Sequence, residues 1–163
     1  MAQQGASGGN GGQAFSDNRP ASQITQVIIT WGAYINTLET HWADGTVIKH
    51  GNVDGPNIDA FVLNDGDLLI AISGSTGNLD GDGGPYVVSI AFTSQNGTTT
   101  STSSPYGGVA PGQPGGIIGG ILHPPSFYDN LAVYSYTAPA GQSIVGFFGR
   151  SGNYIDAIGI FTP

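Results

Sequence analysis

The sequence predicts an all-β fold, and three observations support this. Charged residues make up only 9% of the chain and Gly accounts for 28 of 163 residues, whereas typical soluble domains carry about 25% charged residues. The strong helix formers Glu, Lys and Leu are scarce, and no segment repeats apolar residues at the helical period. Short runs of β-branched and aromatic residues instead alternate with clusters of turn-forming residues, as in strands joined by tight loops.

Strand composition marks nine segments, separated by turn signals rich in Gly, Asn, Asp and Pro. The expected strands span residues 24–31, 35–42, 46–50, 58–63, 68–73, 86–93, 131–137, 143–148 and 154–161. The length fits one domain, residues 1–163, which is large enough to bury a core without disulfides or metals.

One stretch has a different composition. Residues 98–104 are all Ser or Thr, and residues 105–125 are crowded with Gly and Pro. Because Pro removes a hydrogen-bond donor from a sheet and Gly has no side chain to pack, this stretch is unsuited to a central strand. We expect a Gly/Pro-rich insertion at about residues 98–130 on the surface of the single domain, rather than a linker between two domains.

The chain repeats the pattern Gly-x-Tyr-[Ile/Val]-x-x-[Leu/Ile] three times, at residues 32–38, 84–90 and 152–158. Each copy follows an apolar, strand-like run, so each predicts a β-hairpin whose Gly supplies the backbone conformation that the turn needs. Three hairpins of one type within one domain predict threefold pseudosymmetry.

The fifth position of the repeat differs among the copies and is Asn36, Val88 and Asp156. A carboxylate beside a Gly-bounded turn combines acceptor oxygens with backbone N–H donors, and the vicinal hydroxyls of a sugar need both. The alternative is that Asp156 only caps its own turn through an Asx-type hydrogen bond.

The charge balance excludes several partners. With 3 Lys+Arg against 11 Asp+Glu, the formal net charge is −8, so neither nucleic acid nor an anionic membrane surface is expected as a partner. No run approaches the ~20 apolar residues that span a bilayer, so direct membrane insertion is not expected. Residues 1–12 show no secretory signal, which favours a cytoplasmic or non-classically exported protein without assigning its compartment.

Two segments resemble the jacalin-related lectins. Residues 8–12, Gly-Gly-Asn-Gly-Gly, followed by Phe15 and Asp17, are similar to the opening of that family. The more specific match is residues 144–159, Ile-Val-Gly-Phe-Phe-Gly-Arg-Ser-Gly-Asn-Tyr-Ile-Asp-Ala-Ile-Gly, and residues 104–107 resemble a family loop. The resemblance implies a β-prism I fold of three four-stranded Greek-key sheets with pseudo-threefold symmetry, in agreement with the three hairpins.

The resemblance also implies a carbohydrate-binding site. No cofactor is expected, and no metal is expected because His41, His50 and His123 do not have metal-ligand spacing. The Gly12 amide would donate to one sugar hydroxyl, and the backbone N–H groups of Asn153 and Tyr154 would donate to the ring oxygen and the exocyclic hydroxyl. Asp156 would accept from two hydroxyls, and Gly152 would permit the turn. Since residues 1–11 precede Gly12 in one chain, the sequence resembles the uncleaved, mannose/glucose-binding class, whose partners are mannose-containing glycans or glycoproteins.

The other two repeats differ in what they offer a sugar. A second, weaker site at Gly32, Tyr34 and Asn36 is conceivable, because the Asn36 amide both donates and accepts, and the loop at residues 50–55 could face it. No such site is expected at residues 84–88, because Pro85 has no N–H and Val88 has no polar group. The alternative for both is a purely structural turn.

The sequence offers three alternatives to sugar binding. A glycosidase needs two flanking carboxylates, yet the chain has a single Glu, Glu39, and its Asp residues mostly occupy turns, so we do not expect an enzyme. Residues 78–83 resemble half of a calcium loop, but Ser89 stands where a bidentate Glu is needed, and a solvated loop is the favoured interpretation. The third is a structural or toxin-accessory β-prism module with a weak or inactive sugar site.

For a lectin, weak single sites favour a homodimer or higher oligomer.

Overall fold

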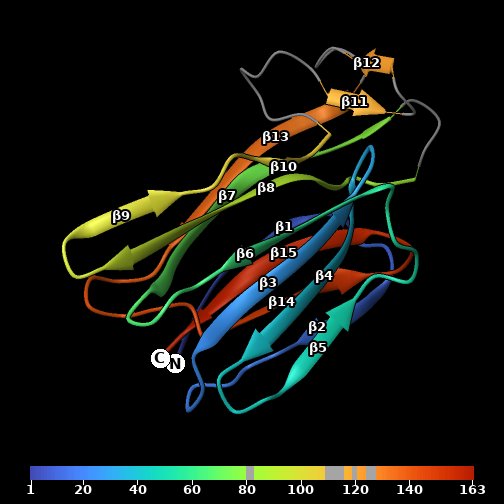
Figure 1. The fold of residues 1–163 in the computed structure, drawn as a ribbon. Helices are drawn as coiled ribbons and strands as arrows, with labels where there is room; N and C mark the ends of the chain where they lie inside the picture. The colour runs from blue at the N-terminus through green and yellow to red at the C-terminus, as the bar shows by residue number, and fades with distance from the viewer. Residues whose placement is uncertain (80–82, 109–115, 119–120, 124–127) are drawn as a thin grey trace.

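The computed structural model describes residues 1–79, 83–108, 116–118, 121–123 and 128–163, and these contain strands and turns but no helix. Three sheets face one another around a common interior (Figure 1). The expected all-β class and threefold arrangement are confirmed, and the fold is a β-prism. Within the described residues, no helix is long and apolar enough to cross a membrane.

The three large sheets share one topology, in which a central hairpin is flanked by two further strands. The first sheet contains β1 (Ala2–Gly8), β15 (Ile155–Thr162), β14 (Gly146–Ser151) and β2 (Gln13–Ser16), in that order. The second contains β5 (Val47–His50), β4 (Ile35–Trp42), β3 (Ile24–Trp31) and β6 (Asn57–Val62). The third contains β10 (Tyr106–Gly107), β8 (Tyr86–Asn96), β7 (Leu68–Leu79) and β13 (Tyr128–Thr137), and β9 (Thr99–Thr102) also pairs with β8.

The central hairpins are the three repeats found in the sequence. Strands β3–β4, β7–β8 and β14–β15 pair antiparallel around them. The turns of the first and last repeat are closed alike, because Gly32 N–H donates to the Tyr34 carbonyl at 3.0 Å and Gly152 N–H donates to the Tyr154 carbonyl at 2.9 Å.

The two strands at the N-terminus, β1 and β2, were not expected from the sequence. Strands β1 and β2 are Gln-, Ala-, Ser- and Gly-rich, so they lack the β-branched residues that mark strands. They form because β15 and β14 present edges to pair with, and β1 begins opposite the chain's last strand, with Ala2 aligned to Thr162. The first sheet is therefore assembled from both ends of the chain, which lie side by side (Figure 1).

Part of the segment expected as an insertion lies in the third sheet. Strand β9 and strand β10 both pair with β8, and residues 128–130 begin β13. Between them, β11 (Gly116–Ile118) and β12 (Ile121–His123) form a small sheet of their own. Residues 109–115, 119–120 and 124–127 of the expected insertion, and Asp80 to Asp82 of the calcium-like segment, lie outside the described residues.

The core fills the space between the inner faces of the three sheets. Fully buried apolar side chains from all of them meet there. They include Val27, Ile29 and Leu38 of the second sheet, Ile72, Ile90 and Phe92 of the third, and Phe147, Ile158 and Ile160 of the first. Successive side chains along a strand point to opposite faces of the sheet, but every residue of β15 is buried, on both faces of that strand.

The tyrosines of the three repeats meet at one end of the prism. The ring centroids of Tyr34 and Tyr86 lie 4.7 Å apart, those of Tyr34 and Tyr154 lie 5.1 Å apart, and those of Tyr86 and Tyr154 lie 5.2 Å apart. We call these three residues the tyrosine cluster. Tyr34 is only 2% exposed, and its hydroxyl accepts a hydrogen bond from the Leu79 N–H at 2.7 Å. The cluster joins one turn from each sheet near the pseudo-threefold axis.

We expect Tyr34→Ala to lower the free energy of unfolding by about 3–5 kcal/mol, because it empties the centre of the tyrosine cluster. Urea unfolding monitored by fluorescence measures the change. Val133→Ala is the control, since Val133 is 71% exposed and its loss should cost less than about 0.5 kcal/mol. A cost below about 1 kcal/mol for Tyr34→Ala would show that the cluster does not hold the three turns together.

Candidate functional site

The residues predicted for the main site come from two places far apart in the sequence. Gly12 ends the loop between β1 and β2, whereas Gly152, Asn153 and Tyr154 form the turn between β14 and β15. Asp156 is the second residue of β15. Strand β2 pairs with β14, aligning Gln13 with Ser151, and this pairing places the loop beside the turn.

The Asp156 carboxylate lies against the glycine loop. A side chain at Gly11 would collide with its Oδ1 atom, and one at Gly12 would collide with its Oδ2 atom. A methyl group on Gly152 would lie 3.7 Å from Oδ2 and 3.4 Å from the Gly12 Cα atom. Gly12 also has a φ of 60°, which disfavours other residues. The structure thus brings Gly12, Gly152 and Asp156 together, and glycine in the loop leaves the room that the carboxylate occupies.

The two neighbouring turn residues have different environments. Asn153 is exposed at the tip of the turn, whereas Tyr154 is partly buried, with its ring in the tyrosine cluster. The Tyr154 side chain therefore serves packing, and its predicted contribution to binding is limited to its backbone N–H. The adjacent second-sheet loop also reaches this turn, because Asn52 N–H donates to the Gly152 carbonyl at 2.9 Å.

The pKa of the Asp156 carboxyl is set mainly by its burial. Asp156 is 4% exposed, and burial raises the pKa of its carboxyl above the ordinary value. The positive charge of Arg150 and the backbone N–H groups of Gly152 and Asp156 oppose this shift in pKa. Arg150 was not predicted as a site residue. Its side chain donates to the carbonyl oxygens of Gly11 and Gly12 at 2.7 and 2.9 Å.

The second repeat has the same outline with different chemistry. Asn36 is 7% exposed and Tyr34 is 2% exposed, while Gly32 is buried. A methyl group on Gly32 would lie 3.3 Å from Cδ of Pro56 and 3.8 Å from Oδ1 of Asn36. The neighbouring loop carries Asp54, whose carboxylate accepts from Lys49 Nζ at 2.7 Å. In the third repeat, Val88 is fully buried.

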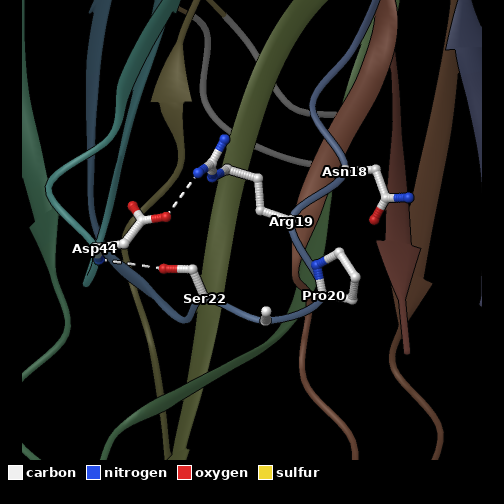
Figure 2. Close-up of a pocket in the computed structure, with 6 residues that line it drawn as sticks. Asn18, Arg19, Pro20, Ser22 and Asp44 are labelled. Carbon is white, nitrogen blue, oxygen red and sulfur yellow. Dashed lines mark hydrogen bonds and ion pairs between the residues drawn. The ribbon is translucent and has the colours of Figure 1, made fainter.

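A pocket lies at the opposite end of the prism, around the β2–β3 connection and the β4–β5 turn. Its lining residues are Asn18, Arg19, Pro20, Ala21, Ser22 and Asp44. Figure 2 shows Arg19 reaching across it to Asp44, at 2.6 Å. The hydrogen bond from Arg19, with help from Thr46, lowers the pKa of Asp44 to about 2. The ion pair joins the two charged side chains of the pocket through Nη2 of Arg19, whereas the buried Nε atom of Arg19 has no hydrogen-bond partner.

Other ionisable residues are held in pairs. Glu39 Oε1 lies 2.7 Å from His41 Nε2 on β4. Asp17 Oδ2 lies 2.6 Å from His50 Nε2, and the His50 ring stacks on Phe15 with centroids 3.8 Å apart. The His50 contacts tie β2 of the first sheet to β5 of the second. Among the described residues, no group of three or more His, Asp or Glu side chains is arranged to hold a metal ion.

Comparison with known proteins adds family information to this geometry. The chain matches the Jacalin-like lectin domain over residues 4–161. It is 32% identical to the jacalin-related lectin Calsepa of Calystegia sepium, covering 94% of this chain and 90% of that protein. Among solved structures, it is similar to AcmJRL of Ananas comosus, described as a mannose-binding jacalin-related lectin, with a TM-score of 0.71 and 27% identity over 99% of this chain and 96% of that one. A structure of Calsepa lectin in complex with a biantennary N-glycan gives a TM-score of 0.72 and 27% identity, covering 99% and 95% of the two chains.

The raised pKa of Asp156 predicts how stability depends on pH. The folded protein binds this proton more tightly than the unfolded chain does, so stability is lost as pH rises from the ordinary value of 3.8 through the folded pKa. We therefore expect Asp156→Asn to have a free energy of unfolding at pH 7 that is at least as large as that of the wild type. Below about pH 4 the wild type should become more stable relative to Asp156→Asn. Urea unfolding at both pH values measures this.

Asp67→Asn is the matched control with the opposite sign. Hydrogen bonds from Asn96 and Asn64 lower the pKa of Asp67, so its charge stabilises the fold above the ordinary pKa and this contribution is lost on acidification. Asp67→Asn should therefore be destabilised at pH 7. If Asp156→Asn is destabilised at pH 7 in the same way, Asp156 is a structural cap of its turn.

Proposed function

This chain belongs to the jacalin-related lectin family and is a carbohydrate-binding lectin, and from that premise we propose that it binds mannose- or glucose-type sugars at the Gly12–Asp156 corner. The ligands would be mannose-containing glycans or glycoproteins. In this proposal Asp156 accepts hydrogen bonds from two sugar hydroxyls, and the backbone N–H groups of Gly12, Asn153 and Tyr154 donate to sugar oxygens.

The observation that carries the proposal is the close approach of the Gly11–Gly12 backbone to the Asp156 carboxylate. A sugar hydroxyl both donates and accepts, so it is matched by a carboxylate acceptor beside amide donors. Burial of the carboxylate strengthens each hydrogen bond that it accepts, because fewer water molecules compete for it. Because a sugar is an uncharged polyol, its binding requires no cationic side chain, and this chain has few of them.

The preference for mannose is supported by the relatives. AcmJRL is described as mannose-binding, and Calsepa lectin has been solved with N-glycans. A few hydrogen bonds to one exposed sugar give dissociation constants on the order of 0.1–10 mM.

We further propose that the protein forms a homodimer or higher oligomer, because linked weak sites raise avidity toward branched glycans.

We propose that the protein is not an enzyme and that binding is its whole activity. The carboxylate of Glu39 is paired with His41 on β4 rather than beside Asp156, so the two-carboxylate arrangement of a glycosidase has no support at this corner. Release of free sugar from an oligomannose substrate during incubation with the protein would contradict this.

The second, weaker site at Gly32, Tyr34 and Asn36 remains a prediction. The strand register supports the expectation that this site is the weaker of the two. The strand register aligns Asn57 with Trp31 as it aligns Gln13 with Ser151. Pro56 therefore stands where Gly12 stands in the first sheet, and proline has no N–H to donate. Asn36 would have to supply most of the hydrogen bonds alone.

We expect Asp156→Ala to weaken binding of methyl α-mannoside by at least about tenfold, because each hydrogen bond to a charged group contributes about 1.5–3 kcal/mol. Isothermal titration calorimetry with the wild type, Asp156→Ala and Asp65→Ala measures the effect. Asp65→Ala removes an equal charge from an exposed loop at the other end of the prism and should bind like the wild type.

The outcomes separate the competing functions. Equal binding by Asp156→Ala and the wild type would place the sugar elsewhere. Residual binding in Asp156→Ala that Asn36→Ala removes would identify the second site. Absence of binding by the wild type at millimolar sugar would favour a structural or toxin-accessory module with an inactive site.

A further inference from the structure

Arg150 holds the glycine loop in a defined orientation. Its Nε donates to the Gly11 carbonyl at 2.7 Å and its Nη2 donates to the Gly12 carbonyl at 2.9 Å. The two acceptors are consecutive backbone carbonyls of the same loop. A planar guanidinium can donate one hydrogen bond to each of them at the same time. Arg150 lies on β14, aligned with Ala14 of β2 and Ala157 of β15.

The orientation of the Gly11 carbonyl sets the orientation of the Gly12 N–H. The two groups belong to one planar peptide unit, and in a trans peptide they point in opposite directions. The cis peptide bonds of the described chain lie elsewhere, at Gly5–Ala6 and Gly84–Pro85. Because the Gly11 carbonyl faces Arg150, the Gly12 N–H faces away from it.

The second repeat shows what happens when another residue occupies this position. Thr30 precedes Gly32 by two residues, as Arg150 precedes Gly152, and it pairs with Thr37 as Arg150 pairs with Ala157. Its hydroxyl accepts a hydrogen bond from the Gly55 N–H at 3.0 Å. At this position the Arg150 side chain therefore donates to loop carbonyls, whereas the Thr30 hydroxyl accepts from a loop N–H, which is then not available to a ligand.

We propose that Arg150 is a positioning residue for sugar recognition, which orients the Gly12 N–H toward the ligand by holding the carbonyls of Gly11 and Gly12. This rests on the proposed function of the Gly12–Asp156 corner. Arg150 also places a positive charge near Asp156, and this charge opposes the rise in pKa that burial causes. It therefore keeps the sugar-accepting carboxylate ionised to lower pH, in addition to orienting the donor.

Two substitutions separate orientation from charge. Arg150→Met removes both, whereas Arg150→Lys keeps the charge but replaces the planar fork with a single ammonium group that does not reproduce the two-point grip. Arg19→Met is the matched control, because Arg19 pairs with Asp44 at the opposite end of the prism. Circular dichroism and urea unfolding verify that each variant is folded.

The test is calorimetric titration with methyl α-mannoside from about pH 3 to pH 7. We expect Arg150→Met and Arg150→Lys both to lose about tenfold or more in affinity at pH 7. Arg150 is the charged side chain whose field acts on the Asp156 carboxyl. The acid-side loss of binding should therefore move to higher pH in Arg150→Met but stay in place in Arg150→Lys. Arg19→Met should match the wild type throughout.

Nuclear magnetic resonance gives an independent reading of the loop in the absence of sugar. The Gly12 amide signal should shift in both Arg150 variants and stay unchanged in Arg19→Met. Wild-type affinity in a folded Arg150→Met protein would overturn the positioning role while leaving the proposed site intact. A wild type that binds no mannoside would instead overturn the proposed function, and the positioning role with it.

Discussion

The close contact between the Gly11–Gly12 backbone and the Asp156 carboxylate is the constraint on which the site depends. A side chain at Gly11 would occupy the space of the carboxylate, and one at Gly12 would collide with both the Ser151 backbone carbonyl and the carboxylate. The contact holds a nearly buried acceptor beside backbone donors, and it costs the fold some stability because an ionised carboxylate loses hydration on burial. The glycines therefore serve both the backbone geometry and the chemistry of the corner.

The rest of the prism holds this contact in place. The loop and the turn come from opposite ends of the chain, and they meet because β2 pairs with β14 and β1 pairs with β15. The turn is fixed from the inside by Tyr154, whose ring packs on Tyr34 and Tyr86. The loop is fixed from the outside by Arg150. These contacts position the loop and the turn before any ligand is present, and such preorganisation lowers the conformational entropy that the proposed sugar binding would cost.

Much of this architecture could be predicted from the sequence. The bounds of β3 and β4 agree with the expected segments, and the repeated Gly-x-Tyr motif marks the central hairpin of each of the three large sheets. Strands β1 and β2 could not be found from composition, because their stability comes from pairing with β15 and β14 rather than from their own residues. The tyrosines could be recognised as a repeat, but their mutual contact depends on the closure of three sheets.

The contacts within the site could be predicted from the sequence only in part. The corner of Gly12, Gly152 and Asp156 was expected from a family resemblance, and the structure brings these three residues together. Arg150 stood within the quoted motif, yet its contacts could not be read there, because it binds carbonyls of a loop 138 and 139 residues earlier in the chain. Backbone carbonyls carry no sequence signal. The difference between Arg150 and Thr30 becomes meaningful only when the strand register aligns them.

The central claim is that a mannose-type sugar binds at the Gly12–Asp156 corner through backbone amides. Its most direct test is a titration of ¹⁵N-labelled protein with methyl α-mannoside, followed by two-dimensional nuclear magnetic resonance. The account predicts that the largest shifts occur at the amides of Gly12, Asn153 and Tyr154, with little change at Asn18, Arg19 and Asp44 of the opposite pocket. Shifts concentrated at that pocket, or spread evenly over the protein, would contradict it.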